Sequence, residues 1–268
     1  NGTDMSFVGG VGYSNIDLIY SGLDRLPDKG EEIFARGFSM QFGGGIPATM
    51  INLSRLGVES RIITFAGHDL FSEFVKKTLN SYPVKTVNLY KGNKMPVVLS
   101  STLLYCGDRS FISYTDGMDL NDAVMDEVYE NLKGAYVVDM HVGFLDVYKR
   151  LKKDGCIQIF DTGWEDDLTL EKYKDYLEIA DYYIPNQKEA MKITGTSSVE
   201  EAADILSEFF SDVTIKMDKE GCLLKNKDGI KIISSVQNVK AIDATGAGDA
   251  FMSGFIYGLY HHHSIEQC

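Results

Sequence analysis

The chain has 268 residues, enough for one large domain, and no segment has the composition of a linker between two domains. Hydrophobic residues make up 44% and aromatic residues 11% of the chain, which suffices for a substantial core and argues against disorder. The formal net charge of -13 opposes general attraction to nucleic acid or to an anionic membrane surface.

The cysteines and the hydropathy indicate the cellular location of the protein. Four cysteines (Cys106, Cys156, Cys222 and Cys268) are scattered without close pairing, which favours reduced thiols over a disulfide framework. No stretch reaches the roughly 18 apolar residues of a membrane span, and the N-terminus lacks a basic segment followed by an apolar one. We therefore expect a cytoplasmic protein that binds neither membranes nor nucleic acid.

The first part of the chain is rich in strand patterns. Segments 30–42 and 95–115 are β-rich without an intervening helix, and Gly107–Asp108 is a hairpin turn pattern. We expect these segments to form a small antiparallel sheet beside the main one.

From about residue 134 the chain alternates short apolar runs with amphipathic segments. The apolar runs at 134–140, 156–161, 181–186 and 212–218 are typical of parallel strands covered on both faces. The intervening segments place apolar residues three and four positions apart, on one stripe of a helix. The alternation predicts βαβ units and an α/β fold, followed by a hairpin at Asp228–Gly229.

Three of these strands end in a polar residue, namely Asp161, Asn186 and Asp218. Ligands bind beyond the carboxyl ends of the strands in an open parallel sheet, so these residues point to one crevice. Each residue alone also fits an ordinary helix cap or turn. Their recurrence on three strands favours a ligand site.

Residues 241–255, AIDATGAGDAFMSGF, have the pattern of an anion-binding turn before a helix. The turn Gly246–Ala247–Gly248 would place consecutive backbone N–H groups at the positive end of that helix, where phosphate oxygens bind. A carboxylate such as Asp249 repels phosphate, so its presence beside a phosphate site needs a function that outweighs this cost. Removing the proton of an attacking hydroxyl is such a function. A role as an ordinary helix cap explains Asp249 equally well. Neither a P-loop nor a complete GxGxxG motif occurs.

The same segment resembles the signature of the ribokinase (PfkB) family of carbohydrate kinases, D-T-x-G-A-G-D-x-F. The matching residues are Asp243, Gly246, Ala247, Gly248, Asp249 and Phe251, whereas Ala244 replaces the usual threonine. Residues 14–45 are similar to the family's first strand, lid strand and glycine pair, 45–57 to its following helix, and 184–190 to its N-x-x-E motif. The resemblance covers almost the entire chain.

The resemblance implies an α/β fold, a ribokinase-like three-layer α/β/α sandwich with a mostly parallel central sheet and a small β-sheet lid. Residues 1–268 would form a single kinase domain, with lid strands from about 13–42 and 93–115. The family's C-terminal helices would be absent from this chain. The lid forms a dimer interface in several relatives, so we also expect a homodimer.

The activity implied by the resemblance is ATP-dependent transfer of a phosphoryl group to a hydroxyl of a sugar or sugar derivative. Asp249 would be the catalytic base, and the amides of Gly246, Ala247 and Gly248 would form an anion hole. Closure of the lid would exclude water.

The ligand-binding residues are also implied by the resemblance. The substrate-binding residues would be Asn15, Asp17, Gly43, Gly44 and His141, and the nucleotide-binding residues Asn186, Lys216, Gly221, Gly246 and Gly248. Asn186 and Glu189 match the pair that holds Mg²⁺ largely through water, although a helix start explains them as well. His141 fits a packed histidine equally well. Asp243 and Thr245 match positions that bind a monovalent cation, which adds K⁺ as a candidate.

The chain departs from the family pattern at the acceptor and nucleotide sites. An ungapped alignment places Ala48 at the position of a sugar-contacting asparagine, and a shifted gap places Thr49 there. Ribokinase itself has a lysine at the position of Gly45, and only Gly221 remains of a T-x-G-x-x-G motif. A nucleoside or vitamin kinase of the same superfamily and a non-catalytic sugar- or nucleotide-binding protein therefore stay open as alternatives.

Overall fold

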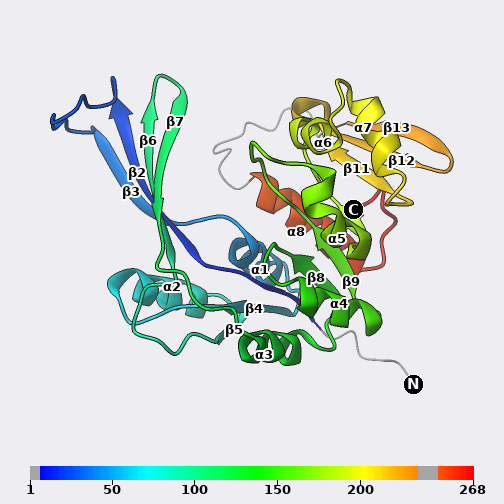
Figure 1. The fold of residues 1–268 in the computed structure, drawn as a ribbon, viewed down its shortest axis with the longest axis horizontal. Helices are drawn as coiled ribbons and strands as arrows, with labels where there is room; N and C mark the ends of the chain where they lie inside the picture. Colours follow the sequence, from blue (N-terminus) through cyan, green and yellow to red (C-terminus); the bar gives the residue numbers. More distant parts are fainter. Residues whose placement is uncertain (1–6, 235–246) are drawn as a thin grey trace.

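A computed structural model describes residues 7–234 and 247–268 (Figure 1). Its centre is a six-stranded sheet in the order β10-β9-β8-β1-β4-β5, in which every pair is parallel. These strands are β1 (Val8–Val11), β4 (Ser60–Thr64), β5 (Lys85–Asn88), β8 (Val137–Met140), β9 (Ile157–Phe160) and β10 (Tyr182–Tyr183). Most residues of β8 and β9 are buried, as the apolar runs at 134–140 and 156–161 predicted.

Helices cover both faces of this sheet. The core on one face contains side chains of α1 (Ile46–Arg55), α2 (Leu70–Asn80) and α8 (Ala247–Tyr260). The core on the other contains side chains of α3 (Asp122–Leu132), α4 (Leu145–Lys153), α5 (Leu170–Ile179), α6 (Gln187–Thr194) and α7 (Val199–Leu206). The predicted three-layer α/β/α architecture is therefore confirmed. In the described part of the chain, no helix has the length and apolarity to cross a membrane.

The position of β1 decides where a ligand site can form. The chain leaves this central strand in one direction to β4 and β5, and returns on its other side through β8, β9 and β10. The strand order therefore reverses beside β1, and the carboxyl ends of β1 and β8 open a crevice of the kind in which open α/β sheets bind ligands.

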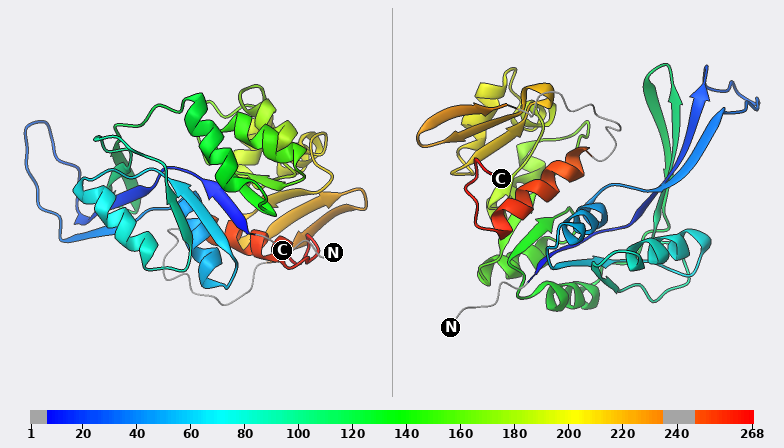
Figure 2. Two further views of the ribbon diagram at one scale, coloured as in Figure 1. Left: turned by 90° about the horizontal axis from the view of Figure 1, so that it is seen from below. Right: turned by 180° about the vertical axis from the view of Figure 1, so that it is seen from behind.

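A second sheet projects from this layer structure (Figures 1 and 2). It has the order β3-β2-β6-β7 and consists of β2 (Asn15–Leu23), β3 (Gly37–Phe42), β6 (Val98–Tyr105) and β7 (Asp108–Tyr114). The expectation of an antiparallel sheet is wrong at its centre, because β2 and β6 are parallel. Both strands leave the same edge of the central sheet, β2 soon after β1 and β6 soon after β5, so they run in the same direction.

Two smaller expectations also need correction. The β6–β7 turn is formed by Cys106 and Gly107, one residue earlier than predicted, and both have positive φ angles, 49° and 74°. Segment 212–218 contains β11 (Val213–Lys216), but this strand pairs antiparallel with β12 (Cys222–Asn226), which pairs with β13 (Gly229–Ile233). The tight connection between β11 and β12 satisfies the backbone of β11 locally. A single parallel bridge between Asn186 and Lys216 extends β11 toward the central sheet.

Candidate active site

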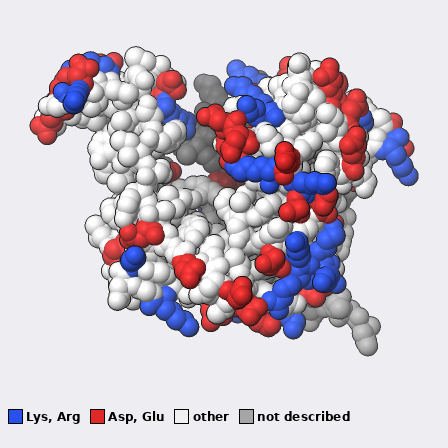
Figure 3. Space-filling view, viewed as in Figure 1, with Lys and Arg blue, Asp and Glu red and all other residues white. Residues whose placement is uncertain are grey.

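A cavity of about 330 Å³ lies at the carboxyl ends of β1, β8 and β9, beside the base of the second sheet, β3-β2-β6-β7, which is called the lid below. The space-filling view shows the molecule hollowed between the lid and the layered body (Figure 3). Its chemically important lining residues are Asn15, Gly45, Thr49, Asp139, His141, Asp161 and Asp249. Three carboxylates and one imidazole thus belong to the lining, and none of the described lining residues is a lysine or arginine.

Asp249 is fixed by the backbone of another helix. It lies in the first turn of α8, half-buried, and its two carboxylate oxygens accept from the Gly45 amide at 3.2 and 3.4 Å. A Cβ atom on Gly44 would lie only 2.7 Å from Asp249 Oδ2, so a side chain at this position would displace the carboxylate from its present place. The described hydrogen bonds of this carboxylate therefore run to the start of α1, whereas a simple cap would bond to its own helix.

The environment of Asp249 favours its protonated form. Burial makes the largest contribution and raises the pKa of Asp249, while the hydrogen bond from Gly45 lowers it. The negative charge of Asp161 raises this pKa further, and the positive charge of Lys216 lowers it. The carboxyl group is therefore a better proton acceptor than an exposed aspartate.

The base of the lid packs against the glycine pair. Asn15 Nδ2 donates to the Gly44 carbonyl at 3.0 Å, and the Gly43 amide donates to the Asn15 carbonyl at 2.7 Å. A Cβ atom on Gly43 would lie 2.9 Å from Asn15 Cβ, which requires a glycine. Asp17 lies two residues further along the same face of β2, where burial raises its pKa. The structure thus brings Asn15, Gly44 and Asp249 together, with Asp17 further up the lid.

Two further residues of the cavity lining lie on β8 and just beyond it. Asp139 is only 4% exposed, and its carboxyl makes no hydrogen bond to the described part of the chain. Burial, followed by the charges of Asp161 and Asp249, raises the pKa of Asp139 well above its usual range. His141 lines the cavity, where burial lowers the pKa of its imidazole and the charge of Asp161 raises it.

Thr49 also belongs to the cavity wall. Of the two residues that the alignment offered for the sugar-contacting position, Thr49 lines the cavity and donates its hydroxyl to the Gly45 carbonyl at 3.3 Å. Ala48 does not belong to the cavity lining.

Asn186 and Glu189 lie at the start of α6. The Asn186 side chain accepts from the Glu189 amide at 2.8 Å, and the Glu189 side chain accepts from the Asn186 amide at 2.9 Å, so the two form a capping box. Glu189 is 6% exposed, and burial raises its pKa. The bond from Asn186 and the charge of Lys216 lower that pKa, whereas the charge of Asp161 raises it.

Lys216 and Gly221 flank the short turn that follows β11. Lys216 is half-buried beside Asn186, and its Nζ lies 5.7 Å from the centre of the Phe251 ring. Its charge lowers the pKa of both Glu189 and Asp249, so Lys216 lies between the two predicted functional regions. Gly221 ends the turn with a φ of 97°, which favours glycine.

Part of the predicted anion and cation sites lies outside the described residues. This applies to Asp243, Thr245 and Gly246, whereas Ala247 and Gly248 begin α8 directly before Asp249. The anion hole and the monovalent-cation site stay predictions.

The polar strand ends predicted Asp161 at a ligand crevice, whereas no sequence pattern assigned a role to Asp139. Asp161 was noticed as a polar strand end, and the structure places it in the cavity wall with its carboxylate accepting from the Gly163 amide at 3.2 Å. Asp139 is the single charged residue of the apolar run at 134–140, and that isolated charge is the signal that could have identified it.

The sequence profile of the pfkB family carbohydrate kinases matches residues 5–268. The chain belongs to this family. It is 23% identical over 268 residues to a ribokinase of Lactococcus lactis, covering 98% of this chain and 86% of the relative. It is 26% identical over 255 residues to a 5-dehydro-2-deoxygluconokinase of Clostridium perfringens, covering 84% of this chain and 74% of the relative.

The three-dimensional comparison agrees with this family assignment. The structure of Arabidopsis thaliana ribokinase, complexed with ribose and ATP, is similar with a TM-score of 0.81 and 22% identity. The match covers 98% of this chain and 88% of that structure. The ribokinase-like fold expected from the sequence motifs of the pfkB family is therefore confirmed.

Replacing Asp139 by asparagine should stabilise the protein, and more strongly at about pH 8 than at about pH 4. Because the pKa of Asp139 is raised in the folded state, unfolding releases a proton above the unfolded pKa, and stability falls as the pH rises toward the folded pKa. The neutral amide of Asp139→Asn avoids this loss, so the free energy of unfolding should rise by an amount on the order of 1–3 kcal/mol at the higher pH. Urea denaturation measures it, with exposed Asp175→Asn as the control. Destabilisation by Asp139→Asn at both pH values would contradict this account.

Proposed function

We propose that the protein is an ATP-dependent phosphotransferase that phosphorylates a hydroxyl group of a sugar or sugar derivative. The observation that carries this proposal is the position of Asp249 in the cavity wall, held by the Gly45 amide in the first turn of α8. In-line phosphoryl transfer needs a proton acceptor beside the attacking hydroxyl and positive potential at the transferred group. The start of α8 offers both at one point.

The reaction follows from these two elements. The acceptor hydroxyl gives its proton to Asp249 as its oxygen forms a bond to the terminal phosphorus of ATP. The bond from that phosphorus to the oxygen bridging it to ADP breaks, so that the products are a sugar phosphate and ADP. The raised pKa of Asp249 supports this role, since a base whose pKa lies nearer to neutrality accepts a proton more readily.

The transferred group would be stabilised by the backbone before Asp249. The amides of Gly246, Ala247 and Gly248 would form the anion hole, and the N-terminus of α8 adds positive potential. A helix that begins at Ala247 supports this arrangement, because its first N–H groups have no partner within the helix.

The nucleotide and its cations would lie beside α6 and β11. No group of three or more His, Cys, Asp or Glu side chains able to enclose a metal ion occurs in residues 7–234 and 247–268. Mg²⁺ keeps several waters and takes phosphate oxygens as ligands, so Asn186 and Glu189 would hold it largely through water. Mg²⁺ would neutralise phosphate charge. Lys216 and Gly221 would contact the nucleotide.

The remaining assignments concern K⁺, the acceptor and the cellular location. Asp243 and Thr245 would bind K⁺. The acceptor-binding residues would be Asn15, Asp17, Gly43, Gly44 and His141, with the lid closing over the sugar to exclude water.

All four cysteines are unpaired, which suits a cytoplasmic enzyme, and the net charge of -13 disfavours nucleic acid as a partner.

Asp249→Asn should reduce turnover by about 10²–10⁴-fold while leaving acceptor binding largely intact, because the amide keeps the shape but cannot accept the proton. ADP release measures turnover across sugars, sugar acids, sugar phosphates and nucleosides with Mg-ATP, and Asp175→Asn is the matched exposed control. Full activity of Asp249→Asn would reject the assignment of the base. Preference for nucleosides would favour a nucleoside kinase, and thermal stabilisation by sugars without any product would favour a non-catalytic binding protein.

The lid has one apolar and one polar face. Leu18 of β2 is paired with Met40 of β3 on one side and with Ser101 of β6 on the other. Ser101 is in turn paired with Ile112 of β7, so these four side chains lie on the same face of the lid. The opposite face carries polar side chains at the next register position, including Asp17, Gln41, Ser100 and Ser113. In Figure 3 charged side chains gather toward the lid tip and leave its shaft nearly uncharged.

The apolar face of the lid is open to solvent. The exposed fractions are 61% for Phe38, 70% for Ile112 and 57% for Tyr114, all on this face. Large exposed apolar patches commonly mark protein interfaces. We therefore propose that two copies of the chain form a homodimer through this face of the lid.

Ile112→Lys should convert the homodimer to a monomer, since it places a charge in the apolar interface. Sedimentation equilibrium at micromolar concentrations measures the mass. Ser113→Lys adds the same charge to the opposite face of the same strand and should leave the dimer intact. A wild-type chain that sediments as a monomer, or a dimer that Ile112→Lys does not weaken, would refute the lid interface.

A further inference from the structure

The acceptor cavity contains a buried acid without a partner. Asp139 is 4% exposed, lines the cavity, and makes no hydrogen bond or ion pair with any residue in the described ranges. It shares a face of β8 with Val137, on the side of the sheet where Ile46 and Met252 provide apolar surroundings. A buried carboxyl in such a place is costly unless a ligand supplies a partner.

The charges around Asp139 are all of the same sign. Asp161 and Asp249 line the same cavity and interact electrostatically with Asp139, raising its pKa together with burial. Within residues 7–234 and 247–268, no lysine or arginine lines the cavity to offset them. A carboxylate or phosphate on the acceptor would be repelled there, whereas a cation would be attracted.

The other two carboxylates already have contacts or roles. Asp249 accepts from the Gly45 amide and would receive the proton of the reacting hydroxyl, and Asp161 accepts from the Gly163 amide. Of these three carboxyl groups, only that of Asp139 has no hydrogen bond to a residue that the structure describes. A neutral hydroxyl would supply one hydrogen bond but no charge to offset the cost of ionising Asp139 beside two other carboxyl groups, whereas an ammonium group would supply both a hydrogen bond and the opposite charge.

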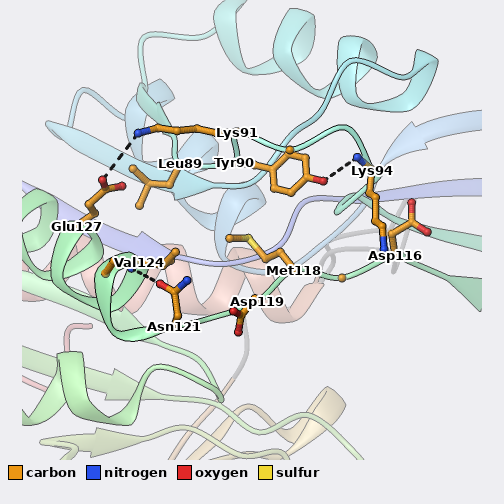
Figure 4. A pocket seen from close by; sticks show the side chains of 13 residues that line it. Leu89, Tyr90, Lys91, Lys94, Asp116, Met118, Asp119, Asn121, Val124 and Glu127 are labelled. Carbon is orange, nitrogen blue, oxygen red and sulfur yellow. Dashed lines mark hydrogen bonds and ion pairs between the residues drawn. The ribbon is translucent and has the colours of Figure 1, made fainter.

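A larger cleft elsewhere on the molecule is lined by polar groups that already have partners within the protein. It has a volume of about 620 Å³ and lies between the segment after β5 and the segment before α3 (Figure 4). Lys91 pairs with Glu127 at 3.9 Å, and the Tyr90 hydroxyl accepts from the Lys94 amide at 2.7 Å. These groups have partners within the protein and do not call for a ligand.

We propose that the acceptor cavity selects a sugar derivative that carries a protonated amine, with Asp139 as the counter-ion of that amine. This inference rests on the proposed kinase function and specifies its substrate class. The acceptor hydroxyl lies at Asp249, and the ammonium group lies at Asp139 on the other wall of the same cavity. Sugar acids and sugar phosphates are excluded by the charge of the lining.

The test compares matched acceptors that differ only at the amine. For several hexose scaffolds, kcat/KM for ADP release is measured with the amino sugar, the parent sugar with a hydroxyl, the N-acetyl derivative and the sugar acid. The best amino sugar should exceed its parent and its N-acetyl derivative by tenfold or more, and the sugar acid should be the poorest. In Asp139→Asn the ratio of amino sugar to parent should fall to near one, while Asp175→Asn should keep it.

Two outcomes overturn the inference and leave the kinase function standing. One is ADP release with neutral sugars or sugar acids and no preference for amines, and the other is an amine preference that Asp139→Asn does not reduce. Asp139→Asn protein is checked by urea denaturation, so that a fall in the ratio is not caused by unfolding. Thermal stabilisation by amino sugars over their parents, lost in Asp139→Asn and without ADP release by the wild type, would support the amine site and reject the kinase function.

Discussion

The hydrogen bond from the Gly45 amide to the Asp249 carboxylate determines the geometry of the whole site. It joins the first turns of α1 and α8 across 204 positions of the chain and directs the carboxylate into the cavity. Gly44 has no side chain because this carboxylate occupies the space, and Gly43 has none because Asn15 does. The glycine pair is therefore explained by the close approach of the lid base and α8, which is a requirement of shape.

Electrostatics gives the site its second constraint. The charges of Asp161 and Asp249 raise the pKa of Asp139 beyond the effect of its burial, and the charge of Asp161 also raises the pKa of Asp249 and Glu189. Lys216 lowers the pKa of Asp249 and Glu189 and so offsets part of this effect. Such an arrangement lowers the stability of the empty protein and increases the benefit of binding a partner of opposite charge. The proposed amine specificity and the predicted gain in stability of Asp139→Asn are two consequences of this one arrangement.

Local patterns in the sequence predicted the strands, the α/β class and the resemblance to the family, but they could not predict pairing between distant segments. The parallel pairing of β2 with β6 depends on where the chain returns after a long connection, and the antiparallel pairing of β11 with β12 depends on the tight turn between them. Asp139 was missed for a related reason, since only the assembled layers show that this position opens into a cavity. Asn186 and Glu189 show that a motif residue can also cap a helix, so neither interpretation excludes the other.

The most direct test of the central claim is a crystal structure of the ternary complex with the best acceptor and a non-hydrolysable ATP analogue. We predict that the acceptor hydroxyl lies about 2.6–3.2 Å from an Asp249 carboxylate oxygen, with the terminal phosphate at the N-terminus of α8. An acceptor hydroxyl bound far from Asp249, with the carboxylate still hydrogen-bonded only to Gly45, would contradict the claim that Asp249 is the base.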